Sequence, residues 1–253
     1  MKNLIKTVAV VLLAVSCQRV QMVAPQTQYG SLGVSLKTES ELVTKADPGV
    51  SLTTSDLNLK IVEKAGSAIK YEGKYTAYTT PLKLPMNTSY TVSAENCTEA
   101  DAETGNGQIR VYGSEEVTIN SLSNDVSFTC TVQNARVEVA FDPSVATYTK
   151  DLKVQLTSGE RQIETAYSAD PCVFWFNPTA ENGFSWTISG SLKETNAPIS
   201  KSGSRTLAAK DNIRLNVSIN ASNGQLIIKQ DAITIDTTIN AGTSIDVLYN
   251  PYV

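Results

Sequence analysis

The sequence predicts an all-β fold made of two tandem β-sandwich domains that follow an export signal. Apolar and polar residues alternate over short stretches along most of the chain, which is the period of half-buried strands. Turn sequences rich in Gly, Pro and Asn separate these stretches. No stretch has the period of an amphipathic helix of several turns. About seven short strands are expected before residue 134 and about eight after it, which is typical of two sandwiches.

The first residues form a secretory signal. Lys2 and Lys6 precede an apolar run over residues 8–15, and Cys17 follows closely. The run is shorter than the roughly 17–25 residues that span a bilayer, which argues against a transmembrane helix. The segment Leu13-Ala14-Val15-Ser16-Cys17 resembles a bacterial lipoprotein signal, in which a small residue precedes a cysteine that is diacylated. We therefore expect residues 1–16 to be removed and Cys17 to carry acyl chains such as palmitate.

The N-terminal sandwich is expected over residues 29–134. Residues 17–28 before it are polar, contain Pro25 and show no helix or strand period, so we expect them to form a flexible tether. The first strand begins near Tyr29, and turns are expected at Asp47-Pro48-Gly49, Leu84-Pro85-Met86-Asn87 and Gly105-Asn106-Gly107. Alternating apolar residues mark the strands: Leu32, Val34 and Leu36; Leu57, Leu59 and Ile61; Val117 and Ile119; and Val126 to Val132.

The C-terminal sandwich is expected over residues 135–253. The boundary at Gln133-Asn134 has almost no linker, which predicts a stiff rod, although one large sandwich or barrel is the alternative. Asp142-Pro143 should end the first strand of this sandwich, and a turn is expected at Ser222-Asn223-Gly224. The strands are marked by Val137, Val139 and Phe141; Leu152, Val154 and Leu156; Phe184, Trp186 and Ile188; Ile213 to Ile219; Leu226 and Ile228; Ile233 and Ile235; and Ile245, Val247 and Tyr249.

The composition argues against an enzyme. The chain contains no histidine, which is the usual general base near neutral pH and a common metal ligand. The net charge of −4 and the scattered basic residues do not form an electrostatic footprint for nucleic acid. The acidic loop 101–107 could offer oxygens to Ca²⁺ but lacks the spacing of a calcium loop, so we expect a solvated turn there. We predict no catalytic site, no metal site and no cofactor.

Three cysteines remain after Cys17. Cys130 shares its parity with Val126, Phe128 and Val132, so a buried thiol is expected there. The alternative is a disulfide between Cys97 and Cys130, since exported proteins often contain disulfides. Cys172 is expected to be free.

Four segments resemble the fimbrillins and fimbrillin-like lipoprotein pilins of anaerobic gut and oral bacteria. They are the lipoprotein signal, the first strand 30–36, the segment Leu42-Val43-Thr44-Lys45-Ala46 and the join 126–139. The join is most similar to an uncharacterised domain family of such exported lipoproteins. The resemblance implies two transthyretin-like sandwiches and a structural or adhesive pilus subunit that forms the shaft, anchor or tip.

The resemblance also implies how such a subunit is processed and assembled. A protease would remove the first strand after Lys37 or Lys45, and other pilin subunits would fill the groove by strand exchange. The donor strand would come from residues 233–235 or 245–249. Asp236-Thr237-Thr238 is similar to the O-glycosylation sequence of these bacteria, with Thr237 as the acceptor. The expected location is the outer membrane, at the cell surface or in the fimbrium, with host glycans or proteins as further partners.

A carbohydrate-binding surface lipoprotein is the alternative function. Trp175 lies between Phe174 and Phe176 in an aromatic strand, and alternation turns it to the opposite face. It could therefore offer a platform to a sugar ring. Packing of both faces in the core is the other interpretation, and the residues favour it.

Overall fold

The computed structural model describes residues 27–38, 52–178, 183–220, 225–234 and 244–249, with side chains as far as Ile219. In this part of the chain the regular structure is mostly β-strand, which confirms the predicted all-β class. Its one α-helix is α2 (Pro143–Tyr148), and three short 3-10 helices occur, η1 (Thr54–Asp56), η2 (Tyr75–Ala77) and η3 (Asp101–Glu103). No helix among the described residues is long and apolar enough to cross a membrane. Cys17, Lys45 and Thr237 lie outside the described residues.

The N-terminal half is a single sheet that folds over into two layers. Its strand order is β3-β2-β5-β6-β7-β1-β4. The fold line lies between β6 and β7, which pair only through Val111 with Val132 and Tyr112 with Thr131. The strands are β1 (Tyr29–Thr38), β2 (Asn58–Glu63), β3 (Ile69–Lys74), β4 (Leu82–Pro85), β5 (Thr88–Glu95), β6 (Val111–Ile119) and β7 (Ser123–Val132).

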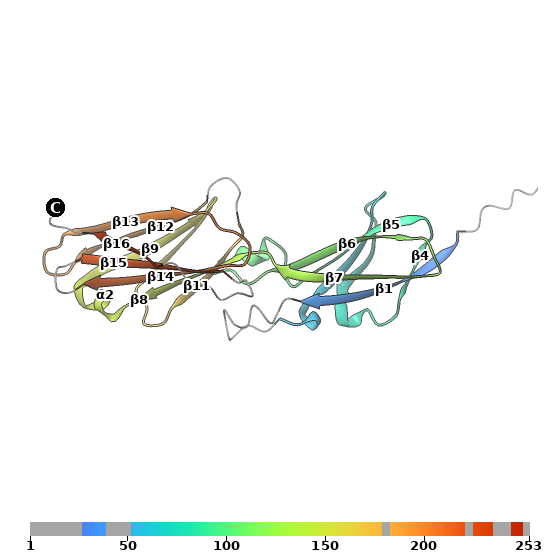
Figure 1. The fold of residues 1–253 in the computed structure, drawn as a ribbon, viewed down its shortest axis with the longest axis horizontal. Helices are drawn as coiled ribbons and strands as arrows, with labels where there is room; N and C mark the ends of the chain where they lie inside the picture. The colour runs from blue at the N-terminus through green and yellow to red at the C-terminus, as the bar shows by residue number, and fades with distance from the viewer. Residues whose placement is uncertain (1–26, 39–51, 179–182, 221–224, 235–243, 250–253) are drawn as a thin grey trace, which may run out of the picture.

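The C-terminal half contains two sheets. One has the order β10-β9-β12-β13, and the other has the order β11-β8-β14-β15-β16. The two halves lie end to end along the long axis of the molecule (Figure 1). The strands are β8 (Ala135–Phe141), β9 (Thr149–Ser158), β10 (Arg161–Ala166), β11 (Cys172–Phe176), β12 (Phe184–Leu192), β13 (Pro198–Arg205), β14 (Asp211–Asn220), β15 (Gln225–Thr234) and β16 (Ser244–Tyr249).

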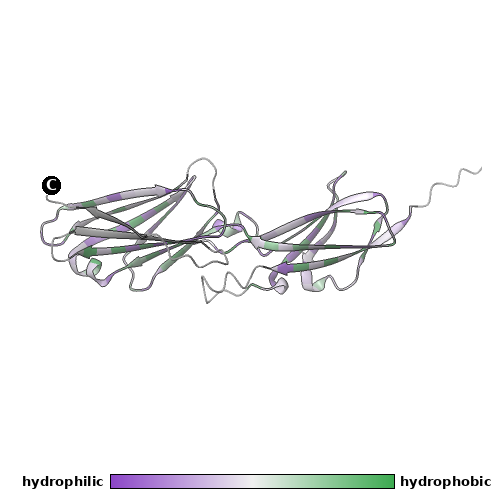
Figure 2. Cartoon of the chain, viewed as in Figure 1, coloured by the Kyte–Doolittle hydropathy of each residue, from purple (hydrophilic) through white to green (hydrophobic). Residues whose placement is uncertain are grey.

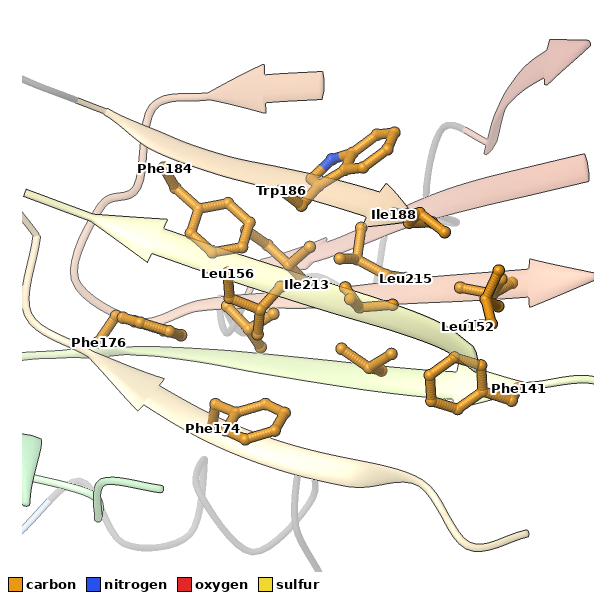
Figure 3. Close-up of a cluster of buried hydrophobic side chains, with 14 of the residues drawn as sticks. Phe141, Leu152, Leu156, Phe174, Phe176, Phe184, Trp186, Ile188, Ile213 and Leu215 are labelled. Atoms are coloured by element: carbon orange, nitrogen blue, oxygen red, sulfur yellow. The ribbon is translucent and has the colours of Figure 1, made fainter. Parts of the chain in front are cut away.

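Two separate clusters of buried side chains hold these layers together. One joins β1, β4 and β7 to β2, β5 and β6, and the other joins the two C-terminal sheets. Figure 3 shows Phe184, Trp186 and Ile188 of β12 facing Ile213 and Leu215 of β14 across the second cluster. Along the strands, hydrophobic and hydrophilic residues alternate (Figure 2), as a sheet with one buried face requires. Burial of this apolar surface is the main force that stabilises the fold.

The connections of the first half are repeated in the second. In the first half β1 runs parallel to β7 and pairs antiparallel with β4, while β2 pairs with β3 and β5, and β5 with β6. Adding seven to each number gives the second half: β8 with β14 and β11, β9 with β10 and β12, and β12 with β13. The hairpin β15–β16, which is added beside β14, has no counterpart in this repeat.

The repeat and the two clusters support the predicted domain boundary, which stays a prediction. The N-terminal cluster contains residues before residue 133 and the C-terminal cluster residues after residue 134, except at β11, where Val173 packs against the N-terminal cluster. Trp175 of β11 belongs to the N-terminal cluster, although β11 pairs with β8 of the C-terminal half.

Candidate functional site

The first strand fills a slot between β4 and β7, which we call the β1 slot. Eight residues, Ser31 to Thr38, pair in parallel with Ser123 to Cys130 of β7. On the other edge only Tyr29 to Leu32 pair with β4. Leu32 and Leu36 are buried and Val34 is half-buried, so the predicted alternation of this strand is confirmed.

Two tyrosines complete the edge of β1 where β4 ends. The Tyr78 hydroxyl donates a hydrogen bond of 2.6 Å to the Leu32 carbonyl oxygen, and the Tyr75 hydroxyl donates one of 3.2 Å to the carbonyl oxygen of Val34. Tyr78 also accepts a hydrogen bond from the Leu82 backbone N–H. Burial raises the pKa of the Tyr78 hydroxyl, which keeps it protonated and able to donate. No sequence pattern singled out these tyrosines, because Tyr75 lies in the three-residue helix η2 and Tyr78 directly follows it, in a segment without a period.

Lys37 lies at the end of β1 with its side chain exposed. It is opposite Thr129 in the register with β7. Cleavage after Lys37 or Lys45 stays a prediction, as do lipidation of Cys17 and glycosylation of Thr237.

Trp175 is not an exposed platform, which corrects one of the two interpretations of the aromatic strand. Its side chain is 5% exposed and packs in the N-terminal cluster, whereas Phe174 and Phe176 pack in the C-terminal cluster. Alternation does turn Trp175 away from its neighbours, but the opposite face of β11 is covered by the N-terminal half. The Trp175 backbone N–H donates a hydrogen bond of 2.9 Å to the Asn106 carbonyl oxygen.

Further contacts join the two halves around this tryptophan. Arg161 lies over the Phe176 ring and donates to the carbonyl oxygens of Trp175 and Gly105. The Asn177 backbone N–H donates to Glu103, 3.1 Å away. We call this set of contacts the joint; it consists of residues 99–110, 133–134, 161 and 175–177.

The three cysteines among the described residues are free thiols. Cys97, Cys130 and Cys172 form no disulfide, so the proposed bridge between Cys97 and Cys130 is wrong and the interpretation of Cys130 as a buried thiol is confirmed. Burial raises the pKa of Cys130 to about 11. Its sulfur lies 3.6 Å from the Ala94 carbonyl oxygen, on the core side of β7.

A polar groove of about 590 Å³ lies beside the joint. Its floor is the outward face of β2, β3 and β5, and loop residues between Asn96 and Gln108 form its wall. A 3.0 Å ion pair between Lys60 and Glu72 crosses the floor. Among the described residues, no group of three or more acidic or cysteine side chains could hold a metal ion.

Comparison with known proteins places the chain in one family. Among solved structures it is similar to the fimbrial anchor protein Mfa2 from Porphyromonas gingivalis, at 13% identity and a TM-score of 0.42, covering 85% of this chain and 100% of that one. It is also similar to a fimbrial assembly protein from Parabacteroides distasonis, at 11% identity and a TM-score of 0.39, covering 88% of this chain and 99% of that one. No curated protein matches the sequence at a significant level. The model of a family described as a domain of unknown function, DUF4493, matches residues 29–248, so the chain belongs to that family.

Proposed function

We propose that this protein is a fimbrial subunit, structural or adhesive, that joins other pilin subunits by strand exchange at the β1 slot. The observation that carries the proposal is the arrangement of β1. It lies between two other strands of its sheet and is the first strand of the fold, so its removal would open an apolar groove lined by the partners of Leu32, Val34 and Leu36. An extended strand from another subunit would fill this groove with main-chain hydrogen bonds.

The unmatched hairpin supports the proposal from the other end of the chain. β1–β7 and β8–β14 form equivalent sets, and β15–β16 are additional to both. The second set therefore has all the strands of the first without the hairpin. Release of the hairpin toward another subunit would therefore leave the repeated set of strands intact.

The test removes β1 and asks whether the slot recruits a strand. Protein lacking residues 17–45 should form concentration-dependent complexes with other pilin subunits of the same cell in sedimentation velocity, whereas protein with residues 17–253 should not. A truncated protein that stays monomeric with every pilin partner at high concentration would contradict the exchange model.

Membrane attachment is the second part of the proposal. We propose that acylated Cys17 anchors the chain to the outer membrane, since several acyl chains hold a protein to a membrane far more firmly than a single chain. The Cys17→Ala variant should be absent from the membrane fraction after a high-salt wash. Its persistence there would mean that another anchor exists.

Carbohydrate binding is a second candidate, and the polar groove is the observation that favours it. Asn58, Ser93 and Gln108 in its lining offer the amide and hydroxyl groups that recognise sugars. Titration with mannans and mucin glycans should show binding that Ser93→Trp abolishes, because the added ring would fill the groove. Equal binding by this variant would exclude the groove as the site.

A further inference from the structure

One residue of β1 has no room for a side chain. Gly30 is buried and pairs with Leu84 of β4. A Cβ atom added there would overlap the Ser121 carbonyl oxygen and lie 2.7 Å from Ile119 Cγ2. Since Cβ atoms do not approach heavy atoms this closely, even alanine at this position requires a shift of the strand or of its neighbours.

The wall opposite Gly30 is held in place by a buried asparagine. Asn124 Nδ2 donates to the Ser121 carbonyl oxygen at 2.8 Å, and Asn124 Oδ1 accepts from the Ser121 backbone N–H at 3.3 Å. The same amide donates to the Ser31 carbonyl oxygen of β1 at 3.2 Å. Moving the Ser121 carbonyl away from a larger residue would therefore break a partly buried hydrogen-bond network.

A second glycine, Gly33, also limits the size of the side chain at its position, but less strictly than Gly30 does. Gly33 is opposite Asp125 of β7, and an added Cβ would overlap the Asp125 carboxylate. The Asp125 side chain is exposed and can turn aside, so residues larger than glycine are tolerated there at a lower cost. An acidic residue at this position would face a like charge, which destabilises cross-strand pairs.

The contacts that the tyrosines and the asparagine make with β1 do not distinguish one sequence from another, whereas the Ser31 hydroxyl donates an exposed hydrogen bond of 3.0 Å to the Leu122 carbonyl oxygen. In β1, the hydroxyls of Tyr75 and Tyr78 and the amide of Asn124 bind main-chain carbonyl oxygens, which every strand offers. The selection of an occupant therefore depends on Gly30 and on the apolar positions of Leu32, Val34 and Leu36.

We infer that the β1 slot admits only strands with glycine at the Gly30 position and apolar residues two, four and six positions later. This inference rests on the proposed function, in which the slot exchanges its strand. The partner is accordingly a strand of a different pilin subunit that carries the pattern of β1.

The C-terminal strands of a second copy do not meet this requirement. If Ile245, Val247 and Tyr249 take the places of Leu32, Val34 and Leu36, Thr243 falls at the Gly30 position and Asp246 falls opposite Asp125. The segment that begins at Gly224 supplies the glycine, Leu226 and Ile228, but it places Gln230 where Leu36 is buried. If Ile233 and Ile235 take the places of Leu32 and Val34, Asp231 falls at the Gly30 position. The expected donors 233–235 and 245–249 are therefore poor occupants of this chain's own slot.

The test uses the whole chain with a site-specific protease sequence inserted after Lys45, so that cleavage leaves β1 bound without a covalent link. Fluorescence anisotropy then follows the displacement of labelled β1 by peptides. Peptide 29–38 should displace it, and the Ser35→Ala peptide, the matched control at an exposed position, should do so equally well. The Gly30→Ala peptide should be weaker by at least about tenfold, since overpacking of this size costs that much or more.

A rescue experiment separates the effect of the glycine from the effects of other differences between the peptides. Peptide 241–250 should fail to displace β1, and its Thr243→Gly, Asp246→Gly form should succeed. Equal displacement by the Gly30→Ala and Ser35→Ala peptides, failure of the rescue, or no exchange by any peptide would overturn the inference. If the predicted ranking holds but the cleaved chain never joins fimbrial subunits, the selection stands and the proposed function fails.

Discussion

At the scale of single residues, Phe128 and Thr129 show that strand parity decides burial. Phe128 is 9% exposed and faces the N-terminal core, while Thr129 is exposed on the other face of β7. We predict that Phe128→Ala lowers the free energy of unfolding by about 3–5 kcal/mol, because it leaves a cavity. Thr129→Ala should change it by no more than about 0.5 kcal/mol. Equal shifts of the urea midpoint for the two variants would show that the register of β7 is different.

The buried Cys130 thiol gives a residue-scale prediction for alkaline pH. Burial raises its pKa in the folded protein from 9.0 to about 11, so the folded state holds the proton more tightly than the unfolded state. The resulting stabilisation is complete below pH 9 and is lost as the pH rises toward 11. Urea unfolding should therefore show a steeper loss of stability over this range for the wild type than for Cys130→Ala. If the free energy of unfolding fell equally with pH in both proteins, the raised pKa of Cys130 would be contradicted.

At the scale of elements, the sequence reveals strands better than it reveals their partners. The alternation in β1, β7 and β14 predicted those strands, because one face of each is buried. β4 was expected to be part of a turn, since Pro85 at its end usually marks one. The six-residue helix α2 is too short to show a helical period. Parallel pairing of β1 with β7 depends on long-range packing and leaves no local pattern, so neither the pairing nor the strand repeat could be predicted.

The site at β1 was predicted only in part for the same reason. The apolar positions Leu32, Val34 and Leu36 follow from local alternation. The special role of Gly30 could have been inferred from the sequence, because glycine inside a strand often marks a close approach of other atoms. Tyr75 and Tyr78 reach β1 from a separate segment, which only the folded structure brings near.

Helix α2 offers an element-scale prediction. The Asp142 carboxylate accepts a hydrogen bond of 2.8 Å from the Ser144 backbone N–H at the helix N-terminus, and hydrogen bonds from Ser144 lower its pKa. Asp142→Ala should lower the free energy of unfolding by about 1 kcal/mol at pH 7, as the loss of an N-cap does. The difference from wild type should shrink as the pH falls below 3.8, where the unfolded-state carboxyl and then the folded-state carboxyl become protonated. A difference that stays constant down to pH 2 would exclude the cap as its cause.

At the scale of the whole molecule, the joint decides whether the two halves move independently. Arg161 connects Phe176 and Trp175 of the C-terminal half with Gly105 of the N-terminal half, and its side chain is largely buried. We predict that Arg161→Ala broadens the distances between spin labels placed at Glu72 and Lys201, measured by pulsed electron resonance. Lys153→Ala, which removes an exposed ion pair with Glu164 away from the joint, serves as the control. Unchanged distributions in the Arg161→Ala protein would show that the remaining contacts suffice.

The parallel pairing of β1 with β7 has a mechanical consequence for a protein held by its N-terminus. β1 runs along the long axis of the molecule (Figure 1), and a pull on residue 29 along that axis acts parallel to both strands. Such a load shears the ladder, so the main-chain hydrogen bonds from Ser31 to Thr38 must yield together. A pull across the strands would instead open the pairs one after another. The strand at residues 29–38 is therefore oriented in the direction that resists tension best.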